Sequence, residues 1–208
     1  MDTLKSDLIK KKKRRWLDIG ANKNFEQGFL YMDISPKKII PKEFRDSYIQ
    51  LSILTAGEKE FSRIGKFDLV RMQHVIEHFD FEDAVKVLKN ASLLLSRGGL
   101  ILLTVPDLKK NIKEYLNGHY KKWPEFVKWA QKRIPKNAPL SFYFSIFTHS
   151  LPATRHFWCY DAKGLKYVIN LTGKYRNIKK LDIQNFQSSI PFTHNRPQED
   201  LCILAVKK

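Results

Sequence analysis

Residues 67–107 read FDLVRMQHVIEHFDFEDAVKVLKNASLLLSRGGLILLTVPD, and this stretch decides the fold of the chain. Residues 67–72 and 100–105 are short apolar runs rich in branched side chains. Such runs are typical of strands buried on both faces of a parallel sheet. The stretch therefore predicts two neighbouring parallel strands joined by a crossover.

The segment between these strands has the pattern of an amphipathic helix. Apolar residues recur at helical spacing from Ala84 to Leu95, and Asp80 is placed to cap the N-terminus. Gly98-Gly99 is expected to end the helix. A right-handed crossover then places residues 73–79 at the carboxyl edge of the sheet, where open α/β sheets bind ligands. This predicted loop carries four polar side chains: Gln73, His74, Glu77 and His78.

The rest of the chain continues the alternation of strands and helices. Further strands are expected at residues 15–19, 29–33, 47–51, 177–184 and 201–206, and a helix at 161–172. Residues 108–150 interrupt this order with aromatic, basic and proline-containing sequence, which predicts a helical insertion. We expect a basic N-terminal segment at residues 1–14 and a single domain at residues 15–208.

Composition limits the class of protein. A chain of 208 residues can bury one sizeable core. Two cysteines are too few for a disulfide framework, no apolar run has the length of a membrane span, and no signal peptide is visible. These features predict a soluble, cytoplasmic protein.

The formal net charge of +17 has two interpretations. The basic runs at residues 10–15 and 109–136 fit an anionic partner such as nucleic acid, a membrane face or an acidic substrate. A solvated lysine-rich surface explains the same charge equally well. Charge alone therefore does not decide the function.

The order of motifs resembles the class I S-adenosylmethionine-dependent methyltransferases. It runs from Asp18-Ile19-Gly20 through a second strand that ends in Asp33 to FDLV, HVIEH and RGGLILLTVPD. In particular it is similar to the group with an H-V-x-E-H sequence, whose members often occur in surface-polysaccharide biosynthesis and modify sugars. The resemblance implies an α/β, Rossmann-like methyltransferase fold: a mostly parallel, seven-stranded sheet with helices on both faces. It also implies S-adenosyl-L-methionine as the cofactor.

The loop after the first strand agrees with this cofactor in part. Gly20 permits a tight turn, Ala21 is small enough for a close ligand approach, and Asn22 tolerates the left-handed conformation. The family usually has more glycines here, and this chain has Asn22 and Asn24 instead. NAD and FAD are disfavoured, because their pyrophosphate requires a stricter glycine pattern.

Asp33 is the main candidate for holding the cofactor, because an acid at the end of the second strand can accept hydrogen bonds from both ribose hydroxyls. A strand-end turn or a helix cap is the alternative for Asp33. By resemblance, Asp18 binds the amino group of the ligand and Leu51 lies near the adenine; a structural hydrogen bond is the alternative for Asp18. The predicted cofactor-binding residues are Asp18, Gly20, Ala21, Asn22, Asp33, Ile34, Leu51, Gln73 and His74.

The catalytic residues are predicted in the loop at residues 73–79. Methyl transfer to a hydroxyl requires an aligned acceptor and a base, for which histidine and carboxylate are suited. By resemblance, His74 flanks the cofactor while Glu77 and His78 lie nearer the acceptor. His156 is a candidate for substrate binding. Backbone hydrogen bonding, capping or aromatic packing are the structural alternatives for these side chains.

Other chemistries lack their motifs in this chain. There is no phosphate-binding P-loop, no nucleophile elbow and no paired Cys or His spacing for zinc, so no metal site is predicted. The sequence predicts a methyltransferase acting on a saccharide or other small hydroxylated acceptor. The basic segments keep an RNA methyltransferase as one alternative. The glycine-poor first loop keeps a non-catalytic binding protein as another.

Overall fold

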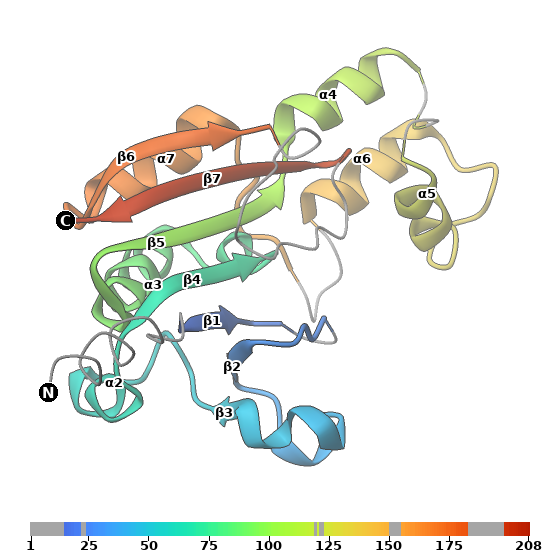
Figure 1. Cartoon of the computed structure of the whole chain (residues 1–208). Coiled ribbons are helices and arrows are strands. Elements are labelled where there is room, and N and C mark those ends of the chain that lie inside the picture. The colour runs from blue at the N-terminus through green and yellow to red at the C-terminus, as the bar shows by residue number, and fades with distance from the viewer. Residues whose placement is uncertain (1–14, 22–23, 119, 121–122, 150–154, 183–197) are drawn as a thin grey trace, which may run out of the picture.

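Seven strands form one sheet in the order β3-β2-β1-β4-β5-β7-β6 (Figure 1). The computed structural model describes residues 15–21, 24–118, 120, 123–149, 155–182 and 198–208. The strands are β1 (Trp16–Ile19), β2 (Phe29–Asp33), β3 (Tyr48–Gln50), β4 (Phe67–Gln73), β5 (Leu95–Pro106), β6 (Tyr175–Leu181) and β7 (Asp200–Lys207). Strands β1 to β5 pair in parallel, whereas β7 is antiparallel to both β5 and β6.

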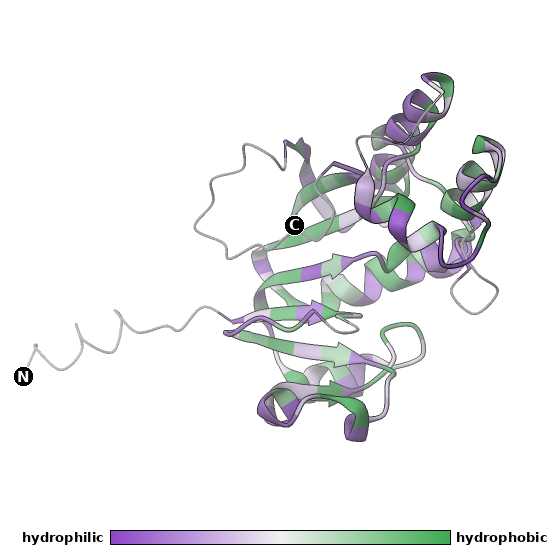
Figure 2. Cartoon of the chain, turned by 90° about the vertical axis from the view of Figure 1, so that its right-hand side faces the viewer, coloured by the Kyte–Doolittle hydropathy of each residue, from purple (hydrophilic) through white to green (hydrophobic). Residues whose placement is uncertain are grey.

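The central strands are buried on both faces, and alternate side chains enter two separate apolar clusters. In β5, Ile101, Leu103 and Val105 join one cluster, whereas Leu102 joins the other. The strands are largely hydrophobic along their length (Figure 2). This burial explains the continuous apolar runs in the sequence, because neither face of these strands contacts water.

Three α-helices contribute side chains to the larger cluster. They are α2 (Glu58–Ile64), α3 (Phe81–Leu94) and α7 (Ala162–Leu171). Asp80 caps α3 by accepting a hydrogen bond from the Asp83 amide at 2.9 Å. Asp161 caps α7 in the same way through the Gly164 amide at 2.8 Å. Both helices therefore begin where a capping acid precedes an apolar helical pattern.

Gly98-Gly99 does not end helix α3, contrary to the sequence prediction. The helix ends at Leu94, and β5 begins immediately at Leu95. Leu95 pairs with Phe67, and pairing resumes between Leu100 and Leu69, so the glycines lie in an irregularity of β5. Gly98 has a φ of +76°, which explains a glycine at this point of the strand.

Two short 3-10 helices, η1 (Lys37–Ile39) and η2 (Lys42–Ser47), lie next to the second cluster. Ile40, directly after η1, and Phe44, within η2, pack there together with Ala21 and Phe25 from the connection between β1 and β2. The described residues between β1 and β2 form only turns, without a helix. The second strand therefore follows the first closely.

Helices α4 (Leu108–Leu116), α5 (Pro124–Ala130) and α6 (Leu140–His149) lie beyond the carboxyl end of β5 (Figure 1). Their aromatic side chains form a third apolar cluster, separate from those of the sheet. Its buried members are Tyr120, Trp123, Phe126, Ala130, Tyr143 and Phe147. None of the helices in the described residues has the length and apolarity that a membrane span requires.

Candidate functional site

Gly20, which the sequence predicted to form a tight turn, lies in the loop after β1. Gly20 has a φ of +74°, and its amide donates to the Met32 carbonyl at 2.9 Å. A Cβ atom on Gly20 would lie 2.6 Å from Cγ2 of Val75, so a larger residue would collide with the loop after β4. Ala21 is buried, and Asn22 lies outside the described residues. Glycine is thus required here by both conformation and space.

Asp33 ends β2 with its carboxylate only partly engaged. Oδ1 accepts hydrogen bonds from the amide of Ser35 at 3.1 Å and from its hydroxyl at 3.2 Å. No described residue binds Oδ2. The Leu51 amide donates to the Asp33 carbonyl at 3.0 Å, and Ile34 is 71 % exposed. An acid, an exposed apolar side chain and Leu51 therefore meet at one strand end.

Asp18 forms a buried ion pair that the sequence analysis did not foresee. Its Oδ2 lies 2.6 Å from Nη2 of Arg71, and Nη1 of Arg71 lies 2.8 Å from Oε2 of Glu26. Arg71 is fully buried, and its guanidinium lies 4.1 Å from the Phe29 ring centroid. Oδ1 of Asp18 makes no hydrogen bond in the described structure.

Burial dominates the electrostatics of this pair. It raises the pKa of Asp18 to about 6, although the attraction of Arg71 and its hydrogen bond oppose that shift. The pKa of Arg71 is held above its ordinary value by Asp18 and Glu26 despite burial. One signal for the pair was present in the sequence: an arginine within the apolar strand FDLVRMQ requires a buried acid.

His74 lies between two buried carboxylates. Its Nε2 is 2.8 Å from Oδ2 of Asp200, and its Nδ1 is 3.3 Å from Oε1 of Glu77. Burial opposes the charged imidazole, but Asp200 and Glu77 raise the pKa of His74 to about 10. At neutral pH both ring nitrogens therefore carry protons, and His74 is a cation rather than a base.

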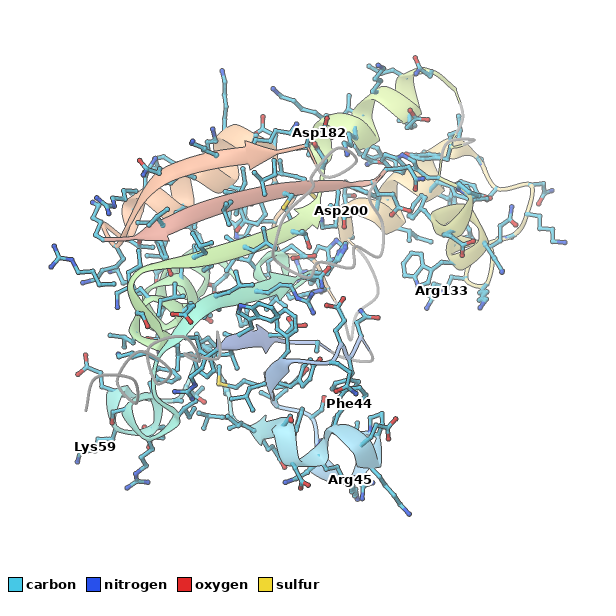
Figure 3. The ribbon with its side chains drawn as sticks, viewed as in Figure 1. Phe44, Arg45, Lys59, Arg133, Asp182 and Asp200 are labelled. Carbon is cyan, nitrogen blue, oxygen red and sulfur yellow. The ribbon has the colours of Figure 1, made fainter. Side chains whose placement is uncertain are left out.

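Asp200 is the site residue that sequence reasoning missed. It begins β7 and pairs with Pro106 at the carboxyl end of β5 (Figure 3). The sequence placed the start of this strand at residue 201, which left Asp200 outside the element. The antiparallel entry of β7 between β5 and β6 brings this acid to His74, and no local pattern predicts that.

Glu77 is the centre of a cluster of titratable groups. Its side chain is 1 % exposed; Oε1 pairs with Nδ1 of His74 at 3.3 Å, and Oε2 has no partner in the described structure. Burial opposes ionisation, yet the attraction of His74, followed by His78 and His156, holds the pKa of Glu77 below its usual value. Glu77 is therefore an ionised carboxylate in an enclosed position.

His78 and His156 both present a free ring nitrogen. Nδ1 of His78 lies 3.0 Å from the Arg155 carbonyl, and Nδ1 of His156 lies 3.0 Å from the Phe147 carbonyl. A carbonyl only accepts, so each Nδ1 donates the hydrogen bond, and Nε2 is the ring nitrogen that this bond does not use. Burial lowers the pKa of His156, which favours the neutral form of its ring.

Backbone contacts hold these two histidines together although they are distant in sequence. The amide of Phe157 donates to the Glu77 carbonyl at 2.8 Å, so the segment around His156 lies against η3 (Ile76–His78). The rings of His78 and His156 have centroids 4.9 Å apart. The structure thus brings His74, Glu77, His78 and His156 together. Gln73, the residue before His74, is buried at the end of β4.

Comparison with known proteins identifies the fold. No protein-family model matches the chain, and no curated protein matches it either. Among solved structures, the S-adenosylmethionine-dependent methyltransferase SibL aligns over 93 % of this chain at 12 % identity, with a TM-score of 0.56. The chain has a methyltransferase fold. This confirms the fold that the order of motifs predicted.

Two further solved structures give the same result. PigF with SAH aligns over 93 % of this chain at 15 % identity, with a TM-score of 0.51. The CurJ carbon methyltransferase aligns over 94 % at 16 % identity, with a TM-score of 0.50. The chain spans about half the length of these structures: 50 % of SibL and PigF, and 49 % of CurJ.

Proposed function

We propose that the chain is an S-adenosylmethionine-dependent methyltransferase that acts on a saccharide or other small hydroxylated acceptor. The observation that carries the proposal is the enclosed cluster of Glu77 with His78 and His156, at the end of β4 in a methyltransferase fold. It supplies imidazole nitrogens at the carboxyl edge of the sheet, where open α/β folds bind ligands.

The residues at the ends of β1 and β2 fit the cofactor. Oδ2 of Asp33 is placed to accept from a ribose hydroxyl, and the exposed Ile34 offers an apolar surface for an adenine ring. Gly20 keeps the backbone turn compact beside them. We keep Ala21, Asn22, Leu51 and Gln73 as proposed neighbours of the cofactor. Oδ1 of Asp18 has no hydrogen-bond partner in the described structure, so it is the atom that would accept a hydrogen bond from the amino group of the cofactor.

The second half of the site would prepare the acceptor. S-adenosylmethionine supplies an electrophilic methyl group on a sulfonium ion. The acceptor oxygen must lose its proton as its bond to the methyl carbon forms, and Nε2 of His78 or His156 can take that proton. His74 cannot, because its nitrogens are protonated; we assign it the role of positioning Glu77.

Helices α4 to α6 would cover the acceptor side of the site. They follow β5 directly and lie beyond its carboxyl end (Figure 1). Phe147 of α6 accepts the hydrogen bond from His156, which links these helices to the histidine cluster. We propose that residues 15–208 act as one domain in which this insertion excludes water from the transfer.

Calorimetric titration with S-adenosylhomocysteine tests the cofactor assignment. We expect the unmodified chain to bind and to gain thermal stability, because a ligand of the folded state stabilises it by mass action. Asp33→Ala should weaken binding at least about tenfold. This factor corresponds to about 1.4 kcal/mol, which is close to the contribution of one hydrogen bond to a charged group. Asp46→Ala, at an exposed acid in η2, is the matched control.

The results of this titration test the proposed function and the assigned cofactor site separately. Absence of binding at millimolar ligand would exclude the methyltransferase proposal. Equal binding by Asp33→Ala would leave the fold intact and refute the assigned cofactor site. Transfer of a labelled methyl group to a panel of sugars and nucleotide sugars then tests the acceptor class.

A further inference from the structure

The side chains of Glu77, His78 and His156 form the one group of potential metal ligands in the part of the chain that is described. One donor atom from each residue can be chosen so that all three lie within 4.8 Å of one another. Glu77 is buried, whereas the two histidines are partly exposed. The cluster therefore has one enclosed side and one accessible side.

The donors have the chemistry of a metal site. Glu77 is an enclosed carboxylate: Oε1 is ion-paired with His74 at 3.3 Å, whereas Oε2 has no partner among the described residues. Each histidine directs its Nδ1–H at a backbone carbonyl, at 3.0 Å in both cases, which leaves Nε2 as the ring nitrogen that this bond does not use. Metal-bound histidines are held in this manner by a hydrogen bond on the other ring nitrogen.

We propose that Glu77, His78 and His156 bind a divalent transition-metal ion, with Zn²⁺ as the first candidate. Two imidazoles and one carboxylate are a ligand set of catalytic zinc sites, in which the fourth position is open to water or substrate. Mg²⁺ is disfavoured because it prefers oxygen ligands. Ligands about 2.0–2.1 Å from a tetrahedral ion lie roughly 3.3 Å apart, so binding would draw the three donors closer.

The surrounding groups support a site limited to these three ligands. Cys159 is engaged elsewhere, because its Sγ donates to the Thr148 carbonyl at 3.4 Å. His74 is occupied by Asp200 and Glu77. The fourth position is therefore left for a water or an acceptor hydroxyl on the accessible side.

The consequence for the reaction rests on the proposed function. A bound ion would lower the pKa of an acceptor hydroxyl at the open position, and the released proton would pass to solvent water. The imidazoles would then act as ligands instead of bases. The sequence predicts no metal site, because these ligands come from two distant segments and have no recognisable spacing along the chain.

The test is direct titration of the chelator-stripped full chain with Zn²⁺, in competition with a chromophoric chelator. We expect one ion per chain, and an affinity at least about 100-fold lower in His78→Ala and in His156→Ala. His149→Ala is the control, since His149 is an exposed histidine of α6 outside the cluster. Equal affinity in the cluster variants, or no stoichiometric binding by the unmodified chain, would overturn the inference.

A second measurement needs no variant and guards against misfolding. X-ray absorption of the zinc-loaded chain should show two imidazole nitrogens and a carboxylate oxygen at about 2.0–2.2 Å. A first shell of sulfur, or of water oxygens alone, would overturn the site. Because S-adenosylhomocysteine binding is measured separately, zinc binding without cofactor binding would refute the proposed function and leave this inference standing.

Discussion

His74 has a backbone φ of +53°, which is uncommon for residues other than glycine, although histidine adopts it more often than most. Its amide donates to the Thr104 carbonyl at 2.9 Å, which anchors the strained residue to β5. Two carboxylates then fix the ring from opposite sides. Strain of this kind persists where the surrounding contacts over-determine it, and it gathers at functional sites.

Arg71 carries the first prediction at the residue scale. Arg71→Ala should lower the free energy of unfolding by about 3–5 kcal/mol, because it leaves the buried Asp18 carboxylate without its partner. Urea unfolding followed by circular dichroism measures the change. Arg97→Ala, at an exposed arginine, should shift it by no more than about 0.5 kcal/mol. A loss below about 1 kcal/mol in Arg71→Ala would show that the pair is dispensable.

Asp18 predicts a pH dependence of stability. Its pKa is raised from 3.8 to about 6 in the folded state, so its contribution is complete below pH 3.8 and is lost as the pH rises through about 6. The free energy of unfolding of the unmodified chain, minus that of Asp18→Asn, should fall by about 2–3 kcal/mol across this window. Unfolding titrations at each pH measure both. A difference that grows toward neutral pH would mean that the attraction of Arg71 outweighs burial.

These residues show what local sequence can predict about a site. Gly20 and Asp33 occupy their expected places because each is dictated by its own strand end. Arg71 and Asp200 were missed because their roles depend on partners far along the chain: 53 residues separate Arg71 from Asp18, and 126 separate Asp200 from His74. Long-range pairing follows from sheet order, which periodicity does not encode.

At the scale of elements, helix α3 begins and ends for different reasons. Asp80 fixes the start through a side-chain hydrogen bond, which its sequence position made predictable. The end follows from tertiary pairing: Leu95 joins Phe67 in the sheet before the glycines are reached. The glycines were expected to end the helix, but strand pairing already ends it at Leu94, and both glycines lie within β5.

The cap of α3 carries the element-scale prediction. Asp80→Ala should lower the free energy of unfolding by about 1 kcal/mol, because the Asp83 amide loses its acceptor. Asp80→Asn keeps an acceptor at the same position and should cost much less. Thermal or urea unfolding of the two variants measures the contrast. Equal losses would show that the charge of Asp80, acting on the helix dipole, matters more than the hydrogen bond.

At the scale of the whole molecule, a strongly basic chain surrounds an acidic site. The chain has 38 lysines and arginines against 21 acidic residues. Five acidic side chains nevertheless gather around the strand ends: Asp18, Glu26, Asp33, Glu77 and Asp200. Arg71 and the protonated His74 lie among these acidic side chains. The basic surface of the rest of the chain favours anions.

The basic surface is the reason to consider RNA as an alternative acceptor. Aromatic side chains can stack on bases only where they are exposed, but Tyr120, Trp123 and Phe126 are at most 4 % exposed. They pack against each other and against α6. Stacking on bases is therefore unavailable to these three rings.

We accordingly expect RNA association to be electrostatic and independent of sequence. Affinity for short single-stranded RNA, measured by fluorescence anisotropy between about 50 and 200 mM salt, should fall along a line of log K against log salt concentration. Its slope should be about −0.7 for each phosphate contacted. Two RNAs of different sequence should give the same line, because phosphate contacts carry no sequence information. Sequence-selective binding that survives about 200 mM salt would instead make RNA the acceptor, since base recognition would then have to come from the site itself.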